Sequence, residues 1–510
     1  MKPERASNWP RVAIIGAGIS GIAMAIKLSR AGMTNFTIFE SADGLGGTWR
    51  ANTYPGCSVD VPSPLYQYSF NNVNWKRTHP NQDEILDYLT ETSQRFGLTP
   101  HYRFDTEVEA IRWDERIHRY HLSAGGIDEE FDIVVSAVGF LVEPNVPAWP
   151  GLEDFRGIRF HTARWDHGVD LRDKRVAVVG VGSTSVQVVP AIQPLVDHLY
   201  VFQREPGWVV PRNGRDYTDE EMLTYSSPLR RRLRRLKLIL QTEGRYVGGP
   251  HYIEGCRRHR RLEAAALEYI RSVFRDRPDL EDAVTPRYPF SGKRRVLSDN
   301  FYPTLLKDNV ELVPRPVARV TERGLVDDRG TEYKVDVIIT STGFTTSQYL
   351  ARLKVYGRSG RELHDVWKDE PYALLGLTVP GFPNFYMMYG PNTNGSGAPG
   401  FHWIAQQEAA AIVRDLRRMV RHGYTALQTK PRYAQAYDDW MQKRLRRTTW
   451  NSSNNYTKNK AGRIVTQIHT SATLRWLLLR ILPRFGNYGR RLVGSQPRPR
   501  RGAWRKIDWT

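Results

Sequence analysis

The sequence has very few cysteines. Cys57 and Cys256 are the only two among 510 residues, so no disulfide framework beyond a single bridge is possible. There is also no Cys-x-x-Cys pair and no cysteine–histidine cluster at metal-ligand spacing. These absences argue against a dithiol reductase and a structural zinc site, and they favour a reducing, cytoplasmic setting without a bound metal.

Long apolar runs are missing as well. No stretch of about twenty residues is apolar enough to cross a bilayer. The apolar segment that begins at residue 11 has glycines at nucleotide-loop spacing, and no small-residue cleavage site follows it. We therefore interpret it as a buried strand and helix rather than as a signal peptide.

Acidic residues are in deficit. The 54 Asp and Glu residues face 74 Lys and Arg residues, which gives a formal net charge of +20. This balance favours an anionic partner, which could be nucleic acid, an acidic membrane surface or a phosphate-rich cofactor. No nucleic-acid recognition motif accompanies the charge, so we expect no nucleic-acid partner.

Two segments of the chain resemble each other. In the first, an apolar strand at 11–15 precedes the loop GAGISG at 16–21, and a second strand ends at Glu40. In the second, a strand at 175–179 precedes GVGSTS at 180–185, and the next strand ends at Arg204. In both copies the strand-end residue lies 24 positions after the first glycine. The pattern predicts two βαβ dinucleotide-binding units.

The first glycine loop has every part that phosphate binding needs. Gly16 allows the tight turn, Gly18 lets the backbone approach a pyrophosphate, and Gly21 allows close helix–strand packing. The helix that follows points its N-terminus at the phosphates. Glu40 can accept hydrogen bonds from ribose hydroxyls, so this unit is predicted to bind FAD.

The second unit departs from this pattern. Gly180 and Gly182 are present, but Ser185 replaces the third glycine. Arg204 occupies the position of Glu40, and a guanidinium suits a 2′-phosphate. Its neighbour Glu205 is unfavourable beside a phosphate unless it is paired or turned away. The second unit is predicted to bind NADPH in preference to NADH.

Strand-like runs at 132–139 and 336–343 each end in glycine followed by phenylalanine and would close the two units. We predict an α/β fold with two nested Rossmann-like dinucleotide-binding domains and a helical insertion. The expected segments are FAD domain 1–150, NADP domain 151–213, helical insertion 214–290, NADP domain 291–374, and 375–510 for the FAD-domain return and basic C-terminal tail.

The insertion and the tail both combine leucines with arginines. Within the insertion, arginines surround a stripe formed by Leu229, Leu233, Leu236 and Leu240. In the tail, an apolar run at 474–482 is followed by Arg484, Arg490, Arg491, Arg498, Arg500 and Arg501. One hypothesis is peripheral contact with an anionic membrane. The alternative is a docked C-terminal helix with a solvated tail.

Two further segments identify a family resemblance. GGTWRANTYPGCSVD at 46–60 and FRGIRFHTARWD at 155–166 resemble the two fingerprints of type I Baeyer–Villiger monooxygenases, and every specified position matches. The resemblance extends from about residue 10 to about residue 410. It implies that NADPH reduces FAD and that O2 then forms a C4a-peroxyflavin, which converts a ketone to an ester or lactone.

The resemblance also implies roles for individual residues. Arg294 would be the catalytic cation that stabilises anionic intermediates. Asp60 would position it, and Lys293 would help to hold the 2′-phosphate. Trp49 and Tyr66 match aromatic residues beside the flavin. The full set of expected cofactor-binding residues is Gly16, Gly18, Ser20, Gly21, Glu40, Thr48, Trp49, Asp60, Tyr66, Gly180, Gly182, Ser183, Thr184, Ser185, Arg204, Lys293 and Arg294.

Other features leave alternatives open. His161, near Trp165 on the predicted domain linker, would either couple domain rotation to NADPH binding or serve as a structural histidine. The loop 390–400 would line the flavin or form a surface loop, and 450–456 resembles the family's substrate-side loop only loosely. Alternative functions are a monooxygenase of sulfur or nitrogen, an NADPH reductase or oxidase, and a non-catalytic FAD-bound membrane protein.

Overall fold

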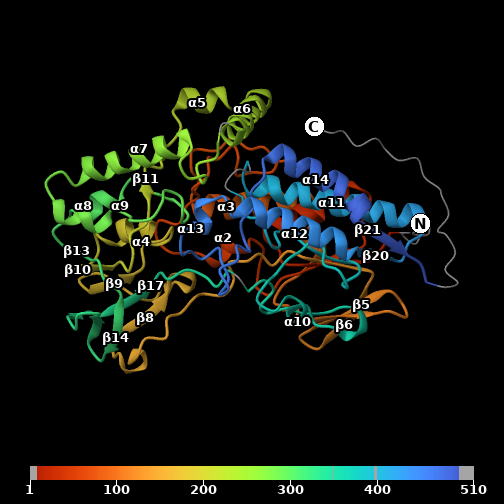
Figure 1. Cartoon of the computed structure of the whole chain (residues 1–510), viewed down its shortest axis with the longest axis horizontal. Helices are drawn as coiled ribbons and strands as arrows, with labels where there is room; N and C mark the ends of the chain where they lie inside the picture. The colour runs from red at the N-terminus through yellow and green to blue at the C-terminus, as the bar shows by residue number, and fades with distance from the viewer. Residues whose placement is uncertain (1–8, 248, 347, 396–398, 493–510) are drawn as a thin grey trace.

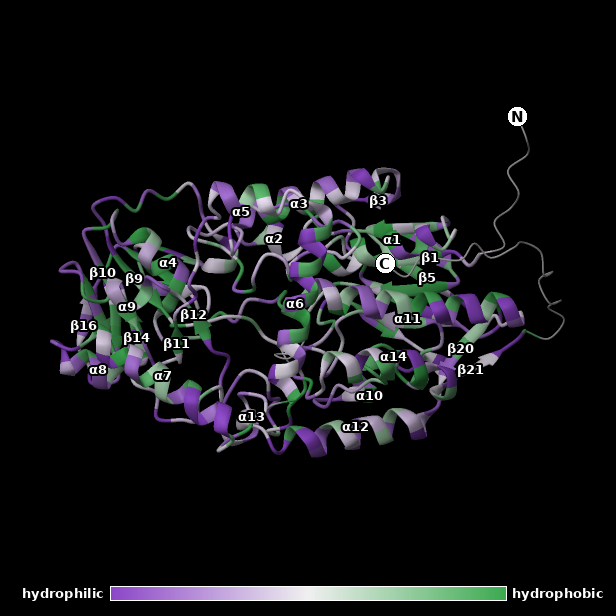
Figure 2. Cartoon of the chain, turned by 90° about the horizontal axis from the view of Figure 1, so that it is seen from above, coloured by the Kyte–Doolittle hydropathy of each residue, from purple (hydrophilic) through white to green (hydrophobic). Residues whose placement is uncertain are grey.

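The computed structural model describes residues 9–247, 249–346, 348–395 and 399–492. Two five-stranded parallel sheets lie toward opposite ends of the long axis of the molecule, and helices pack around both of them (Figures 1 and 2). This arrangement confirms the predicted α/β fold with two Rossmann-like units.

The first sheet is the FAD-type unit. Its strands have the order β19-β7-β1-β2-β3 and all pair in parallel. They are β1 (Val12–Ile15), β2 (Phe36–Phe39), β3 (Tyr102–Arg103), β7 (Ile133–Ser136) and β19 (Phe385–Met387). All four residues of β1 and of β7 are buried and mostly apolar, as expected for strands covered on both faces.

Different layers cover the two faces of this sheet. One face packs on α1 (Ile19–Arg30) and α11 (Phe401–His422), which contact each other closely. The other packs on a meander of β4 (Ala110–Asp114), β5 (Arg119–Ala124) and β6 (Ile127–Phe131), extended by β18 (Lys354–Tyr356). The remaining elements here are α2 (Thr48–Ala51), α3 (Gln82–Arg95) and η1 (Thr99–His101).

The second sheet is the NADP-type unit, with the order β13-β10-β9-β17-β8. Its strands are β8 (Ile158–His161), β9 (Arg175–Val179), β10 (His198–Phe202), β13 (Val310–Val313) and β17 (Val337–Thr340). α4 (Ser185–Ile192) and α9 (Phe301–Thr304) lie over one face, and β14 (Val317–Thr321), β15 (Gly324–Asp327) and β16 (Glu332–Lys334) lie over the other. Short elements here are β11 (Val209–Val210), β12 (Val296–Leu297), η2 (Leu152–Asp154) and η3 (Thr162–Arg164).

The chain returns to the first domain earlier than the expected boundary at residue 375. β18 pairs with β4, and α10 (Leu363–Trp367) buries Leu363 and Trp367 in the core beneath the first sheet. The short helix η4 (Arg358–Gly360) lies between them. The segment from about residue 350 therefore packs with the FAD-type unit, because its apolar side chains are buried there.

The predicted insertion is helical, with α5 (Asp219–Thr224), α6 (Pro228–Val247), α7 (Arg257–Val273) and α8 (Pro278–Val284). The orientation of α6 is unusual. The four leucines of its stripe are 51–65% exposed, whereas Arg235 is only 6% exposed. A surface helix normally turns its apolar stripe to the core, so α6 has the reverse arrangement.

The C-terminal part combines helices with a small antiparallel pair. It contains α12 (Pro431–Leu445), α13 (Thr449–Ser452) and α14 (Ala472–Gly486), with β20 (Ala426–Thr429) paired to β21 (Asn487–Arg490). The expected helix at 474–482 lies within α14. Arg498, Arg500 and Arg501 are outside the described residues. Within the described ranges, no helix is both long enough and apolar enough to cross a membrane.

A buried ion pair fixes α14 to the core of the first domain. Arg475 contacts Glu408 of α11 at 2.5 Å, and both side chains are almost completely buried. The second carboxylate oxygen of Glu408 accepts a hydrogen bond from the backbone N–H of Tyr389 at 2.8 Å. The pair therefore links α14, α11 and the segment that follows β19.

Replacing Arg475 with methionine should destabilise the protein by about 3 kcal/mol, because a buried carboxylate loses its charge partner. Urea unfolding of the flavin-loaded protein measures this effect. The matched control is Arg484→Met on the exposed side of α14, which should change stability by less than about 0.5 kcal/mol. Equal effects of the two substitutions would contradict a structural role for the pair.

Candidate active site

A cavity of about 1300 Å³ lies between the two dinucleotide-binding units. Its volume exceeds the roughly 300–1,000 Å³ of a pocket for a single ligand, so it has room for more than one. The predicted residues that line it are Gly16, Gly18, Ser20, Glu40, Thr48, Trp49, Asp60, Tyr66, Ser183, Thr184, Lys293 and Arg294. Those that do not are Gly21, Gly180, Gly182, Ser185 and Arg204.

The first glycine loop packs tightly against neighbouring backbone on one side and lines the cavity on the other. A Cβ on Gly16 would lie 2.7 Å from the carbonyl oxygen of Ala137, and one on Gly21 would lie 1.9 Å from the oxygen of Gly16. Gly21 thus serves helix–strand packing, which is why it does not line the cavity. Gly18 lines the cavity and lies close to Gly47, since a Cβ on Gly18 would be 3.6 Å from the Gly47 Cα. This cradle fits a pyrophosphate at the N-terminus of α1.

Glu40 connects the end of β2 to the glycine loop. Its carboxylate accepts hydrogen bonds from the backbone N–H groups of Ala17 at 2.7 Å and Ala42 at 3.0 Å. The side chain is nearly buried and still reaches the cavity. Oε1 also accepts from the Ser41 hydroxyl at 3.3 Å, so Oε2 is the oxygen that retains a lone pair for a ribose hydroxyl, which fits the predicted role.

The second glycine loop resembles the first, except that its third glycine position is occupied by Ser185. Gly180 has φ +118°, and a Cβ there would lie 2.5 Å from the carbonyl oxygen of Ser341. Gly182 has open space around it, which suits close approach of a phosphate. Ser185 is fully buried as the first residue of α4, so a small side chain replaces the third glycine in a packing role.

Three charged residues gather at the end of β10. Arg204 and Glu205 are both exposed there, and Glu205 forms an ion pair with Lys293. Lys293 lines the cavity, whereas Arg204 lies outside its lining. The carboxylate that is unfavourable beside a phosphate is therefore paired with a lysine. The local excess of positive charge fits a 2′-phosphate.

An ion pair between Asp60 and Arg294 joins the two domains inside the cavity. Burial would raise the pKa of Asp60, but the charge and the hydrogen bond of Arg294, together with a backbone hydrogen bond, hold that pKa below the ordinary value. The charge of Asp60 in turn raises the pKa of Arg294. The guanidinium is therefore a permanent cation, and its exposed surface faces the cavity.

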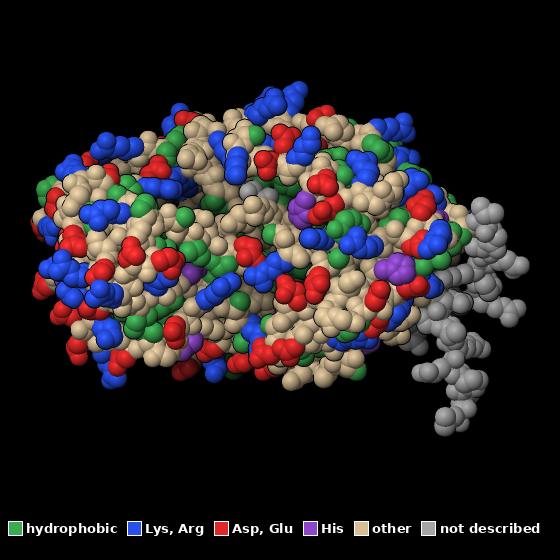
Figure 3. All heavy atoms as spheres, turned by 90° about the horizontal axis from the view of Figure 1, so that it is seen from below, with side chains coloured by type: hydrophobic (Ala, Val, Ile, Leu, Met, Phe, Trp, Pro, Cys, Tyr) green, Lys and Arg blue, Asp and Glu red, His purple; other side chains and the backbone are tan. Residues whose placement is uncertain are grey.

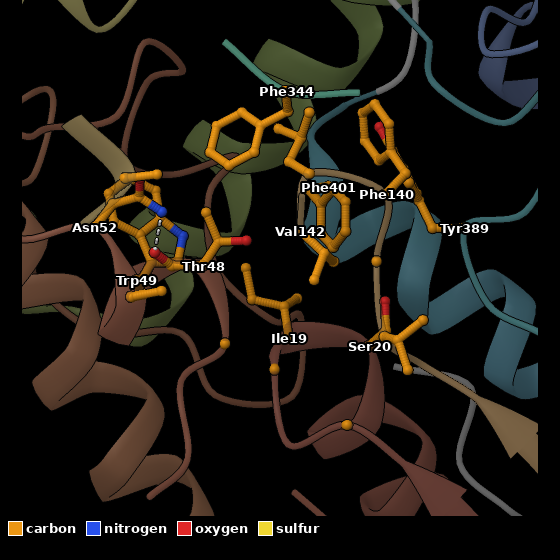
Figure 4. Close-up of a pocket in the computed structure, with 18 of the residues that line it drawn as sticks. Ile19, Ser20, Thr48, Trp49, Asn52, Phe140, Val142, Phe344, Tyr389 and Phe401 are labelled. Carbon is orange, nitrogen blue, oxygen red and sulfur yellow. Dashed lines mark hydrogen bonds between the residues drawn. The ribbon is translucent and has the colours of Figure 1, made fainter. Parts of the chain in front are cut away.

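Trp49 and Tyr66 form a fixed aromatic corner. The Trp49 indole N–H donates to the Tyr66 hydroxyl at 2.9 Å, and the two rings meet edge to face. Buried His402 packs edge-on against Tyr66 from behind, with ring centroids 4.8 Å apart. Asn52 donates to the backbone oxygen of Thr48 nearby (Figure 4). Both aromatic residues line the cavity as predicted.

The apolar wall of the cavity was not predicted. Figure 4 shows Ile19, Phe140, Val142, Phe344, Tyr389 and Phe401 around the open space. Phe140 and Phe344 each follow the glycine that closes a strand, and this repeated Gly-Phe pair was a usable signal. Tyr389 and Phe401, whose ring centroids lie 4.3 Å apart, come from segments without such a signal.

The first fingerprint forms a contact between the domains. A Cβ on Gly56 would lie 2.7 Å from the backbone oxygen of Gln187 in α4. The Gln187 side chain accepts from the Tyr54 hydroxyl at 3.1 Å and donates to the oxygen of Ser58 at 3.0 Å. The Tyr-Pro-Gly segment therefore needs its glycine for close approach, and the same loop delivers Asp60 to the cavity.

The second fingerprint supports local packing. A Cβ on Gly157 would lie 2.5 Å from the backbone oxygen of Asp336. His161 accepts a hydrogen bond from the backbone N–H of Ala163 at 3.0 Å, and Trp165 packs edge-on against Phe160. Neither His161 nor Trp165 lines the cavity. These contacts favour the structural alternative for His161.

Two later loops also reach the site. Asn394, Gly395 and Gly400 line the cavity, as expected for the loop 390–400, of which 396–398 lie outside the described residues. Trp450 and Tyr456 line it from the C-terminal part. The described chain contains no cluster of three or more His, Cys, Asp or Glu side chains placed to hold a metal ion.

Comparisons with known proteins agree with this geometry. Residues 10–236 match the model of the flavin-binding monooxygenase-like family. A Baeyer–Villiger monooxygenase of Pseudomonas aeruginosa is 39% identical over 448 residues, 87% of this chain and 84% of the relative. One from Streptomyces coelicolor is also 39% identical, over 88% of this chain and 86% of the relative.

Solved structures extend the similarity to the whole fold. The structure of OTEMO in complex with FAD and NADP aligns with a TM-score of 0.85 at 25% identity, covering 94% of this chain and 99% of the other. A steroid monooxygenase bound to NADP gives 0.84 at 27% identity with the same coverage. The site and these matches define a flavin-dependent oxidoreductase that uses FAD and NADP.

The chain belongs to the Baeyer–Villiger monooxygenase family. Its identity to the two relatives of that name extends over most of both chains. The family resemblance drawn from the two fingerprints is thereby confirmed, and so are the two cofactors.

The packing of Gly21 makes a direct prediction about the flavin. Gly21→Ala should reduce the ratio of flavin absorbance to protein absorbance by roughly tenfold, because the added Cβ collides with the loop that holds the pyrophosphate. The matched control is Gly244→Ala in α6, where a Cβ meets nothing within 4 Å. Full flavin occupancy in Gly21→Ala would contradict the packing role of this glycine.

Proposed function

We propose that the protein converts a ketone to an ester or lactone, using NADPH, O2 and bound FAD. The observation that carries this proposal is the Asp60–Arg294 pair, which is a permanent cation beside its carboxylate in the cavity. The first glycine loop and Ser183 and Thr184 of the second loop also line this cavity. When bound, the reduced flavin supplies the activated oxygen atom from O2.

The chain's own residues then have separable tasks. Arg294 stabilises the negative charge that develops on the oxygen of the ketone carbonyl. Asp60 holds the guanidinium in place and balances part of its charge. The joined rings of Trp49 and Tyr66 form a rigid surface that orients the flavin, because their hydrogen bond fixes both side chains.

The apolar wall selects the kind of substrate and limits water. Phe140, Val142, Phe344 and Phe401 offer no hydrogen bonds from their side chains and surround the open space beside the polar loops (Figure 4). A ketone with an apolar body fits such a wall, with its carbonyl directed to Arg294. Exclusion of water strengthens the attraction between the guanidinium and the developing charge.

Removing the cation tests the proposed reaction. Arg294→Ala should retain bound FAD but lower the rate of ester formation by roughly a hundredfold or more, the usual cost of losing a donor to a developing oxyanion. Gas chromatography of products from a panel of cyclic and linear ketones measures this rate. Arg319→Ala, an exposed arginine on β14, is the matched control.

Two results would contradict the proposal. Ester formation by Arg294→Ala near the wild-type rate would remove the assigned role of this residue. Oxidation of sulfides or amines by the wild type, with no ester from any ketone, would favour the heteroatom monooxygenase. In that case the shared cavity would remain and the substrate class would change.

The charges near β10 predict a preference for NADPH. The double variant Lys293→Gln/Arg204→Gln should have a KM for NADPH about tenfold to a hundredfold higher than the wild type. The reason is that a hydrogen bond to a charged group contributes roughly 1.5–3 kcal/mol. The KM for NADH should change little, because NADH has no 2′-phosphate. Equal effects on both nucleotides would show that these residues do not select the phosphate.

A further inference from the structure

Helix α6 is held with its apolar stripe toward solvent. Arg234 donates to the Tyr217 hydroxyl at 2.9 Å, and Arg235 donates to the backbone oxygen of Gln67 at 2.8 Å. Arg231 donates to the backbone oxygen of Tyr225 at 2.6 Å. These inward-facing arginines fix the rotation of the helix, so the exposure of the leucines is built into the fold.

Helix α14 extends this apolar surface. Its outward residues Trp476, Leu477, Ile481 and Phe485 are 38–56% exposed, while Arg475 on its inner side is buried against Glu408. Both helices lie along the upper edge of the molecule in Figure 1, on the face that Figure 2 views. They are also joined directly, because Glu243 of α6 accepts a hydrogen bond from the backbone N–H of Ala472 at 3.0 Å.

The charge around these apolar residues is positive. The exposed face of α6 includes Arg230, Arg232, Lys237 and Arg245, and that of α14 includes Arg484. The two helices contain a single acidic residue, Glu243, which bonds the start of α14. On the opposite face, acidic and basic side chains alternate and apolar ones form small separate groups (Figure 3). The two helices therefore combine clustered exposed apolar groups with an excess of basic side chains.

We propose that α6 and α14 together form a docking surface for an anionic lipid bilayer. Leucine, tryptophan and phenylalanine side chains can enter the boundary between headgroups and acyl chains, and the flanking arginines and lysine can contact lipid phosphates. The exposed arginines and the lysine around the apolar residues attract an anionic surface, and they repel the same basic residues of a second copy of the chain. This charge complementarity favours a bilayer over self-association as the occupant.

Vesicle sedimentation of the full-length, flavin-loaded protein tests the proposal. The vesicles contain phosphatidylcholine alone or with roughly 30% phosphatidylglycerol, at salt concentrations of about 20 mM and about 500 mM. The wild type should sediment with the anionic vesicles at low salt and much less at high salt. Leu233→Ser/Leu236→Ser should lower the bound fraction at least tenfold, because two inserted apolar side chains are lost.

The matched control replaces two exposed leucines elsewhere, Leu195→Ser and Leu306→Ser, and should bind as the wild type does. Unchanged flavin absorbance in each variant verifies folding. Failure of the wild type to bind anionic vesicles would overturn the proposal, as would unchanged binding by the Leu233→Ser/Leu236→Ser variant. The surface would instead be a contact between two copies of the chain if the wild type does not bind vesicles, sediments as a dimer in sedimentation velocity, and becomes a monomer when it carries Leu233→Ser/Leu236→Ser.

Discussion

The contact between Asp60 and Arg294 is the constraint that brings the rest of the site together, because its two partners come from different domains. Asp60 is carried on the loop whose Gly56 approaches α4 closely, and Arg294 follows the helical insertion. The pair forms only if both Rossmann-like units hold their glycine loops toward the same cavity. Its charges stay fixed because each group shifts the pKa of the other toward the ionised state.

The sequence allowed the two βαβ units, the cofactors and part of the polar lining of the cavity to be predicted. The reason is local: Gly16, Gly21 and Gly180 need conformations or contacts that only glycine tolerates, so their spacing is visible in the chain. The structure also separates the motif residues that serve packing from those that line the cavity. Gly21 and Ser185 serve packing, and His161 supports its own loop rather than lining the cavity.

Features that depend on distant contacts could not be predicted in this way. Tyr389 and Phe401 meet only because β19 and α11 return to the first domain. The orientation of α6 follows from bonds to Tyr217, Gln67 and Tyr225, which the leucine stripe alone would not suggest. The same insertion leads into His251, which lines the cavity, so the proposed membrane surface and the active site share one segment of the chain.

The most direct test of the account is the fate of isotopically labelled dioxygen during turnover with NADPH and a ketone that the protein accepts. Mass spectrometry of the product should show one labelled oxygen atom in the ester or lactone, with about one NADPH consumed for each product molecule. An unlabelled product, or NADPH consumption that yields only hydrogen peroxide across the ketone panel, would contradict oxygen insertion at this site.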